Sequence, residues 1–313
     1  MTKPIHPKPE VPVPNTHIRY GYSRKRVPIY MDKATGKTYT ANGAMPGRRV
    51  KPEIVGSAVA LFYRGTPLDE IAEQFEHQYD FRPSKATIYE WVTDYTKLAR
   101  DRLGSLKART GNTWVCDESV YIAGGEKFWH YNVLDRDSRF LLASHLARTR
   151  TIKQTEIVFQ KAKEAAHSNP KRIITDGMTA YPEAIERVFG GDTQHVVSEG
   201  LTAKLNNNLS ERMQGTFRQR TKTMRGFQDR QSAQDYFDGY RIHYNFFRGH
   251  ESLKNRRPAE MAGLETSLES WEDVARLDVR PFSYERVKLE KERALKPKPV
   301  YPRRVFIQRR RRL

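Results

Sequence analysis

The sequence has 313 residues, with 56 Lys and Arg against 37 Asp and Glu, so its formal net charge is +19. A chain of this length can hold a catalytic core plus one or two smaller domains, and a positive charge of this size favours polyanionic partners, nucleic acid first. The sequence shows neither an 18-residue apolar run nor an apolar signal core, which excludes a membrane-spanning protein and predicts a cytoplasmic one. The single cysteine, Cys116, excludes a disulfide framework and a zinc site built from several thiolates.

Residues 1–50 are rich in Pro, Lys, Arg and Tyr. One short alternating segment, at Thr38, Tyr39 and Thr40, follows a turn at Gly36. This composition predicts a loose basic N-terminal arm with one hairpin in it.

Residues 51–108 change to the spacing of helices. Three apolar stripes begin at Ile54, Leu68 and Ile88, a turn at Gly65 separates the first two, and Ser84 is a good N-cap for the third. Three short helices with these turns predict a small all-α helix-turn-helix domain.

The third helix of such a domain enters the DNA major groove and contacts bases near its N-terminal end. The residues predicted to face DNA there are Lys85, Thr87 and Tyr89. The same pattern also fits a small helical bundle that only packs against the next domain, and the net charge favours DNA binding over that alternative.

The strand and helix patterns of residues 109–264 predict an α/β catalytic domain. Residues 114–122, 128–134 and 140–146 read as an antiparallel meander, and strands at 172–175 and 196–197 then alternate with helices at 151–167, 181–189, 208–220 and 232–244. Three antiparallel strands joined to later strands through helices give a mixed sheet with flanking helices, the arrangement of a ribonuclease-H-like core. The remaining residues, 265–313, end in a nearly all-basic run and predict a C-terminal extension that is disordered until it meets phosphate.

Three acidic residues fall where phosphodiester chemistry needs them. Asp117 lies among apolar neighbours in the first strand, where an unpartnered acid is costly. Asp176 ends the strand at 172–175, and ligands of open α/β sheets commonly bind at the carboxyl ends of strands. Glu211 follows three asparagines near the start of a helix. Magnesium prefers a few converging carboxylates, and two such ions about 4 Å apart can activate a nucleophile and stabilise the leaving oxygen.

Each acid taken alone has a simpler interpretation: a salt-bridge partner, a turn residue before Gly177, or a solvated helical glutamate. Asparagine is likewise a frequent helix cap, a role that Asn207 or Asn208 could fill. The basic residues that follow Glu211 and are predicted to line DNA are Arg212, Arg218, Arg220, Lys222 and Arg225.

Together these segments resemble the DDE transposases of bacterial and archaeal insertion sequences, in the retroviral-integrase superfamily. The matching pieces are Trp-Val-Cys-Asp-Glu-Ser at 114–119, Ile-Thr-Asp-Gly at 174–177 followed by Tyr181, and Asn-Asn-Asn-Leu-Ser-Glu-Arg at 206–212. The gap between Asp176 and Glu211 is 211 − 176 − 1 = 34 residues, the spacing of one group of these enzymes. The likeness continues through 222–227, 244–250 and 257–263, and covers about half of the chain.

The resemblance implies that Asp117, Asp176 and Glu211 hold two Mg²⁺ ions, for which Mn²⁺ can substitute. It implies hydrolysis at the ends of a mobile element followed by attack of the freed 3′-hydroxyl on target DNA. It further implies double-stranded DNA as the partner, a homo-oligomer of at least two subunits on that DNA, and association with the nucleoid.

The sequence also departs from the family. Many relatives have Asp-His-Arg after the glutamate where this chain has Arg212-Met213-Gln214, and the N-terminal arm lacks the cysteines of a zinc ribbon. Two other functions fit the same residues: a transposase descendant that only binds and regulates DNA, and a ribonuclease-H-like nuclease that cleaves without joining.

Overall fold

The computed structural model describes residues 16–22, 28–34, 36, 38–40, 50–198, 208–222, 224 and 226–277, which fall into two compact units. The described part of the N-terminal unit is a three-stranded antiparallel sheet of β1 (His17–Tyr22), β2 (Pro28–Asp32) and β3 (Thr38–Thr40). The predicted hairpin at Thr38–Thr40 is part of this sheet, which stands where the composition predicted a loose arm. Ile18, Tyr20 and Tyr22 of β1 and Ile29 and Tyr30 of β2 are residue types that favour strands, and Gly36 closes the turn by donating to the Asp32 carbonyl over 2.8 Å.

The larger unit, residues 50–278, begins with the three predicted helices, α1 (Pro52–Arg64), α2 (Leu68–Tyr79) and α3 (Lys85–Leu103). Ser84 caps α3 as predicted, because its hydroxyl accepts from the Thr87 N–H over 3.1 Å. Gly65, with a φ of 95°, ends α1 in the left-handed conformation.

A five-stranded mixed sheet follows, in the order β6-β5-β4-β7-β8. Strands β4 (Thr113–Ala123), β5 (Glu126–Asp135) and β6 (Leu141–Ala147) form the antiparallel meander, and β7 (Arg172–Thr175) and β8 (Gln194–Val197) add in parallel beside β4. This topology confirms the predicted ribonuclease-H-like mixed sheet.

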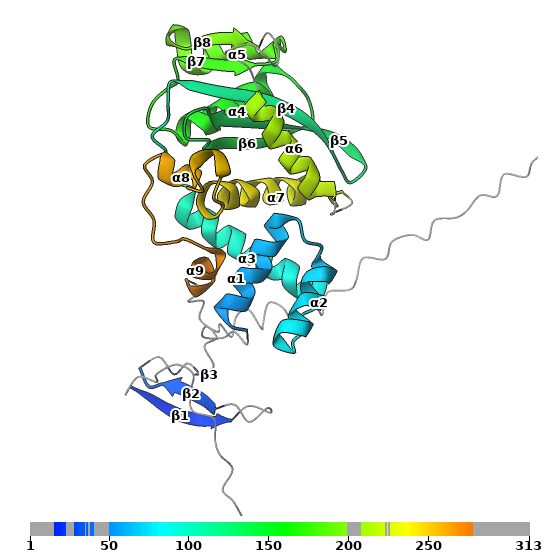
Figure 1. The fold of residues 1–313 in the computed structure, drawn as a ribbon, viewed down its shortest axis with the longest axis vertical. Coiled ribbons are helices and arrows are strands. Elements are labelled where there is room, and N and C mark those ends of the chain that lie inside the picture. Colours follow the sequence, from blue (N-terminus) through cyan, green and yellow to red (C-terminus); the bar gives the residue numbers. More distant parts are fainter. Residues whose placement is uncertain are drawn as a thin grey trace, which may run out of the picture. The chain divides into compact units, whose positions relative to one another are not determined.

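Helices cover both faces of the sheet (Figure 1). On one face, α4 (Ile152–Glu164) and α5 (Ala180–Phe189) pack on even-numbered β4 residues, as the edge-on contact of Trp114 with Phe189 shows. On the other, α6 (Asn208–Lys222) and α7 (Arg230–Ile242) meet odd-numbered ones, as Tyr121 does with Phe237. Because side chains alternate along a strand, consecutive β4 residues face different helical layers.

The helical segment and the sheet share one core. Tyr63 of α1 stacks on Trp271 and on His243, and its hydroxyl shares a 2.6 Å hydrogen bond with Thr96 of α3. Packing of this kind is what the helical-bundle alternative predicted, and DNA reading by α3 stays a prediction.

The fold also continues past residue 264, where the basic extension was predicted to begin. The chain passes through a π-helical turn at His243–Phe247, a 3₁₀ turn at Glu251–Leu253 and α8 (Pro258–Met261). The last helix of the described residues, α9 (Trp271–Arg276), then packs against α1. A Cβ atom on Gly56 of α1 would lie 2.5 Å from the backbone nitrogen of Glu272, so only glycine allows this close approach. The extension can therefore begin no earlier than the end of α9.

Among the residues that the structure describes, no helix has the length and apolar character needed to cross a bilayer.

Candidate metal centre

Asp117 and Asp176 meet because β4 and β7 are parallel neighbours. The register pairs Trp114 with Ile173 and Val115 with Ile174, so two residues further on Asp117 comes level with Asp176, which directly follows β7. Their carboxylates and that of Glu118 offer ligand atoms that all lie within 4.8 Å of one another. We call these three residues the acidic cluster.

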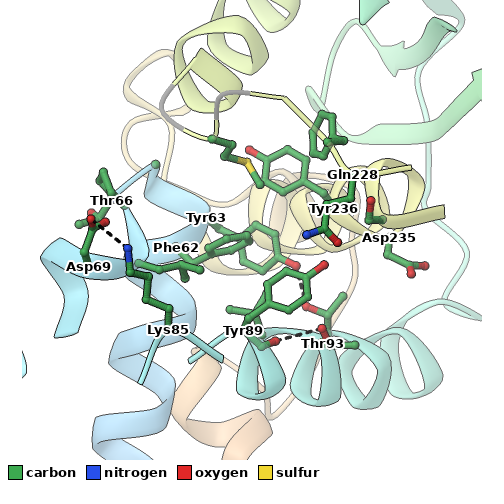
Figure 2. A pocket seen from close by; sticks show the side chains of 18 of the residues that line it. Phe62, Tyr63, Thr66, Asp69, Lys85, Tyr89, Thr93, Gln228, Asp235 and Tyr236 are labelled. Carbon is green, nitrogen blue, oxygen red and sulfur yellow. Dashed lines mark hydrogen bonds and ion pairs between the residues drawn. The ribbon is translucent and has the colours of Figure 1, made fainter. Parts of the chain in front are cut away.

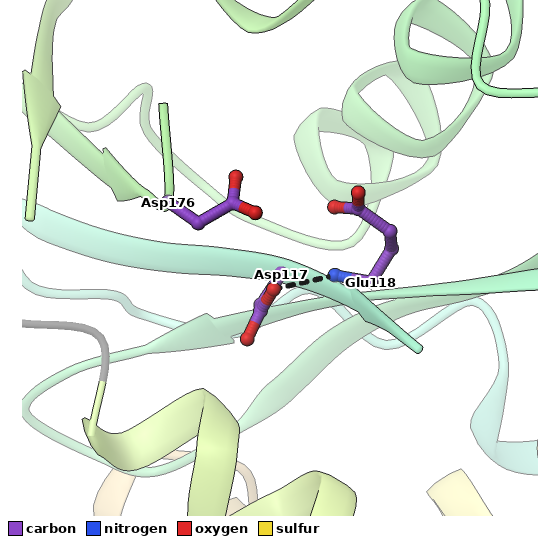
Figure 3. A group of neighbouring side chains, drawn as sticks. All are labelled: Asp117, Glu118 and Asp176. Carbon is purple, nitrogen blue, oxygen red and sulfur yellow. Dashed lines mark hydrogen bonds between the residues drawn. The ribbon is translucent and has the colours of Figure 1, made fainter. Parts of the chain in front are cut away.

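Figure 3 shows how the cluster is assembled. Asp117 and Glu118 project to opposite sides of β4, and the Asp176 carboxylate reaches toward Glu118 from the neighbouring strand. The Glu118 N–H donates to Asp117 Oδ1 over 2.8 Å, and the Met178 N–H donates to Asp176 Oδ1 over 3.1 Å. Backbone donors thus fix the orientation of both aspartates.

Glu118 is the cluster member that the sequence prediction missed. Its carboxylate accepts from Tyr181 Oη over 2.5 Å and from Arg150 Nη1 over 3.1 Å, and its side chain is only 2% exposed. Glu118 and Tyr181 both belong to the sequence motifs that matched the family. Their contact depends on the packing of α5 against this face of β4, which the sequence does not specify.

Glu211 lies in the first turn of α6 and is exposed. It stands outside the acidic cluster, yet its charge acts on Asp117 and helps to raise the pKa of that carboxyl. Gln214, three residues later and so on the same helix face, donates from Nε2 to the Glu118 carbonyl over 3.1 Å. The departure from Asp-His-Arg therefore supplies a side chain that ties α6 to β4. Of the asparagine run, Asn206 and Asn207 lie outside the described residues, and Asn208 begins α6.

The electrostatics of Asp117 favour a bound cation. The pKa of Asp117 is raised to about 7, chiefly by burial and further by the negative charges of Asp176, Glu118 and Glu211, against the opposing hydrogen bond from the Glu118 N–H. Grouped carboxylates around a buried acid are unfavourable without a positive partner, and oxygen ligands of this kind suit a hard divalent ion. The residues present therefore fit a divalent metal.

This pKa shift predicts how stability depends on pH without metal. A folded-state pKa of about 7 against an ordinary value of 3.8 means that the stabilisation from protonated Asp117 is complete below about pH 4 and is lost as the pH rises through 7. In EDTA, we expect Asp117→Asn to have a higher melting temperature than wild type, and we expect this difference to grow from about pH 4 to 7 and then to stay constant. Thermal melts across this pH range measure the difference in melting temperature. Asp192→Asn, a change at an exposed aspartate, is the matched control. A difference between wild type and Asp117→Asn that does not change with pH would contradict the assignment.

The predicted DNA contacts on α3 have other partners. Lys85 Nζ lies 3.3 Å from Asp69 Oδ2, and Thr87 takes part in the Ser84 cap through its N–H and its hydroxyl. Lys85 and Tyr89 line a cavity of about 770 Å³ between α3, the α1–α2 turn and α7 (Figure 2). Tyr89 remains 44% exposed, so the base-contact assignment stays a prediction.

The predicted contacts on α6 divide into two groups. Arg212, Arg218 and Lys222 are exposed. Arg220 is half-buried, lies close to Gly65 and forms a side-chain hydrogen bond with Tyr240, which gives it a structural role. Arg225 lies outside the described residues.

Comparison with known proteins adds a family match. Residues 111–250 match the family model described as a DDE domain. No curated protein sequence matches the chain significantly.

Solved structures of retroviral integrases are also similar to this chain. The HTLV-2 integrase catalytic core domain, in a dimeric form with magnesium, is 14% identical over 50% of this chain and 99% of its own, with a TM-score of 0.37. The BIV integrase catalytic core domain is 14% identical over 48% and 93%, with a TM-score of 0.37. The simian T-cell lymphotropic virus intasome, in complex with the PP2A regulatory subunit B56 gamma, is 11% identical over 53% and 59%, with a TM-score of 0.41.

Proposed function

We propose that this chain, whose residues 111–250 match a DDE domain, is an insertion-sequence transposase that cuts DNA at the ends of a mobile element and joins the freed 3′ ends to target DNA. The observation that carries the proposal is the meeting of Asp117 and Asp176 at the end of the β4–β7 pair, with ligand atoms within 4.8 Å. These residues are 59 positions apart in the sequence (176 − 117), so the fold brings them together.

Asp117, Asp176 and Glu211 are the residues that would hold the metal, which we take to be two Mg²⁺ ions with Mn²⁺ as a substitute. Bound there, divalent ions supply an activated oxygen nucleophile and neutralise charge on the scissile phosphate. Asp117 contributes a carboxylate whose raised pKa reflects its need for a cation. Gln214 holds the face of α6 that carries Glu211 against β4.

Glu118 has a different role in this proposal. Because Tyr181 and Arg150 already occupy its two oxygens, Glu118 acts as a positioning residue that fixes Arg150 beside the metal ligands. Arg150 would then present its remaining guanidinium donors to a phosphate of the bound strand.

The partner that we propose is double-stranded DNA, both the element ends and the target. Arg212, Arg218 and Lys222 are exposed on the helix that carries Glu211, where cations can meet phosphates next to the cut. We propose that the enzyme acts as a homo-oligomer of at least two subunits, since two element ends must be joined, and that it resides with the nucleoid.

The test is an assay with purified protein and linear DNA that carries the short inverted repeats flanking the gene. We expect nicking at the repeat ends and joining of those ends to a second DNA, both in Mg²⁺ or Mn²⁺ and neither in EDTA. Cleavage without joining would indicate a nuclease, and specific binding without cleavage would indicate a DNA-binding regulator. Either result would overturn the proposal.

A further inference from the structure

The far half of the β4–β5 hairpin exposes apolar side chains. Helices α4 and α5 cover the even-numbered β4 residues as far as Glu118, but Val120 is 40% and Ile122 is 53% exposed, whereas Tyr121 and Ala123 between and beyond them are buried. The strand β7 pairs only with Thr113–Val115, so it does not reach this part of β4.

Two residues of β5 complete the same face. The register places Trp129 opposite Val120 and Lys127 opposite Ile122, and opposite residues of an antiparallel pair share a face of the sheet. We call Val120, Ile122, Lys127 and Trp129 the outer hairpin face. A group of exposed apolar side chains of this kind marks a binding surface more often than scattered single ones do.

Cations on this face are held in place. Lys127 Nζ lies 4.5 Å and Arg150 Cζ 4.1 Å from the centroid of the Trp129 ring, and Arg150 is also anchored to Glu118 over 3.1 Å. A cation over an aromatic ring is oriented by the ring's charge distribution, so both groups are set beside the apolar side chains. Apolar groups flanked by oriented cations match a strand of nucleic acid, which offers base faces and phosphates side by side.

The outer hairpin face adjoins the Glu118 side of the acidic cluster. Glu118 belongs to the cluster and pairs with Arg150, and Ile122 lies four residues further along the same strand, roughly 13 Å away at the usual rise. A DNA strand that leaves the cut phosphate across Arg150 therefore reaches Val120 and Ile122 within about four nucleotides, at roughly 3.4 Å per nucleotide along a strand.

We propose that the outer hairpin face binds an unpaired DNA strand next to the cut, with its phosphates on Lys127 and Arg150 and its bases against Val120 and Ile122. The inference rests on the proposed function, since it assigns the DNA strand at the same site. A base leaves the duplex at some energetic cost, which the apolar contacts offset.

The experiment measures binding of the full chain to a fluorescent 20-nucleotide oligo(dT) and to a 20-base-pair duplex, in EDTA, by anisotropy. We expect Val120→Thr combined with Ile122→Thr, which keeps branched strand-forming residues, to weaken oligo(dT) binding about tenfold and duplex binding less than about twofold. We expect Lys127→Gln to reduce the slope of log affinity against log salt for oligo(dT) by about 0.7. The matched control is Lys171→Gln. Lys171 is exposed and precedes β7, at the end of that strand away from Asp176, so this change should alter neither the oligo(dT) affinity nor the salt slope.

Oligo(dT) affinity within about twofold of wild type in the double variant, with an unchanged melting temperature, would overturn the inference. A wild-type dimer in DNA-free sedimentation that the double variant loses would assign the face to a second copy of the chain, and would also overturn it. Binding is measured without metal, so the two proposals can fail separately. If the wild-type chain cuts and joins DNA but the variants keep wild-type affinity for oligo(dT), only this inference is overturned. A chain that binds as expected but never cuts overturns only the proposed function.

Discussion

Asp176→Asn should lower cleavage and strand transfer by at least about a thousandfold while leaving DNA binding in EDTA unchanged. The amide keeps the size and the acceptor that the Met178 N–H needs, but it removes a negative charge from the centre where a divalent cation is proposed to bind. Losing about 4 kcal/mol of transition-state stabilisation, within the several that a metal centre supplies, corresponds to that factor. A gel assay of nicked and joined products measures it.

Asp192→Asn is the matched control for this measurement. Asp192 is exposed and precedes β8, which runs parallel to β7, so it lies at the end of the strands away from Asp176. We expect wild-type products from the control, and near wild-type joining by Asp176→Asn would refute the proposed catalytic role.

The same assay decides which glutamate completes the centre. The resemblance selects Glu211, whereas the acidic cluster contains Glu118. We expect Glu211→Gln to be as inactive as Asp176→Asn, and Glu118→Gln to retain part of the activity because Glu118 acts through Arg150. Rescue of Glu118→Gln at low salt, where weakened phosphate contacts recover, is a readout that a merely structural role would not produce. The reverse order of activities would assign the third ligand to Glu118.

Trp271→Ala should reduce the free energy of unfolding by about 4 kcal/mol, since truncating a buried tryptophan typically costs 3–5. Trp271 is 2% exposed, its ring stacks 5.3 Å from that of Tyr63, and its Nε1 donates to His243 Nδ1 over 3.2 Å. The change leaves a cavity between α1 and α9 and removes the donor to a buried imidazole. Urea unfolding followed by circular dichroism measures the loss.

Two further variants separate packing from surface charge. Trp271→Phe keeps an aromatic ring and should lose about 1–2 kcal/mol, mainly from the missing hydrogen bond. The neighbouring Glu272→Gln breaks only an exposed ion pair with Arg276 and should change stability by less than about 1 kcal/mol. Wild-type stability in Trp271→Ala would show that α9 contributes nothing to the core.

The sequence alone was sufficient to predict the helices and strands that have long or regular residue patterns. The meander, the parallel strand before Asp176 and the Ser84 cap follow from local alternation, helical spacing and capping chemistry, and the structure confirms them. The meeting of Asp117 with Asp176 needs the pairing of β4 with β7, which places Asp117, two residues past the paired stretch of β4, level with Asp176 directly after β7.

Other features depend on tertiary partners that no local pattern specifies. The helix α9 is six residues long, too short to display a helical period, and its place on α1 depends on Gly56. Glu118 reads as an ordinary strand residue until Tyr181 and Arg150 reach it. Lys85 and Tyr89 occupy the exposed helical positions that the spacing predicted, but the spacing says nothing of the cavity that they line beside α7.

The aromatic core that joins α1 and α3 to α7 and α9 would also fix a length along any DNA that α3 reads. A helix-turn-helix on a flexible tether could tolerate variable spacing between the sequence it reads and the bond that is cut. Here α3 is tied to Tyr63 through Thr96, and it cannot turn relative to the sheet without separating Tyr63 from Tyr236 of α7, which packs on β6. If α3 reads the element end, one inserted base pair would rotate the cut site by about 35° around the double helix, given 10–10.5 base pairs per turn. The number of base pairs between the recognised sequence and the cleaved end would then be constant.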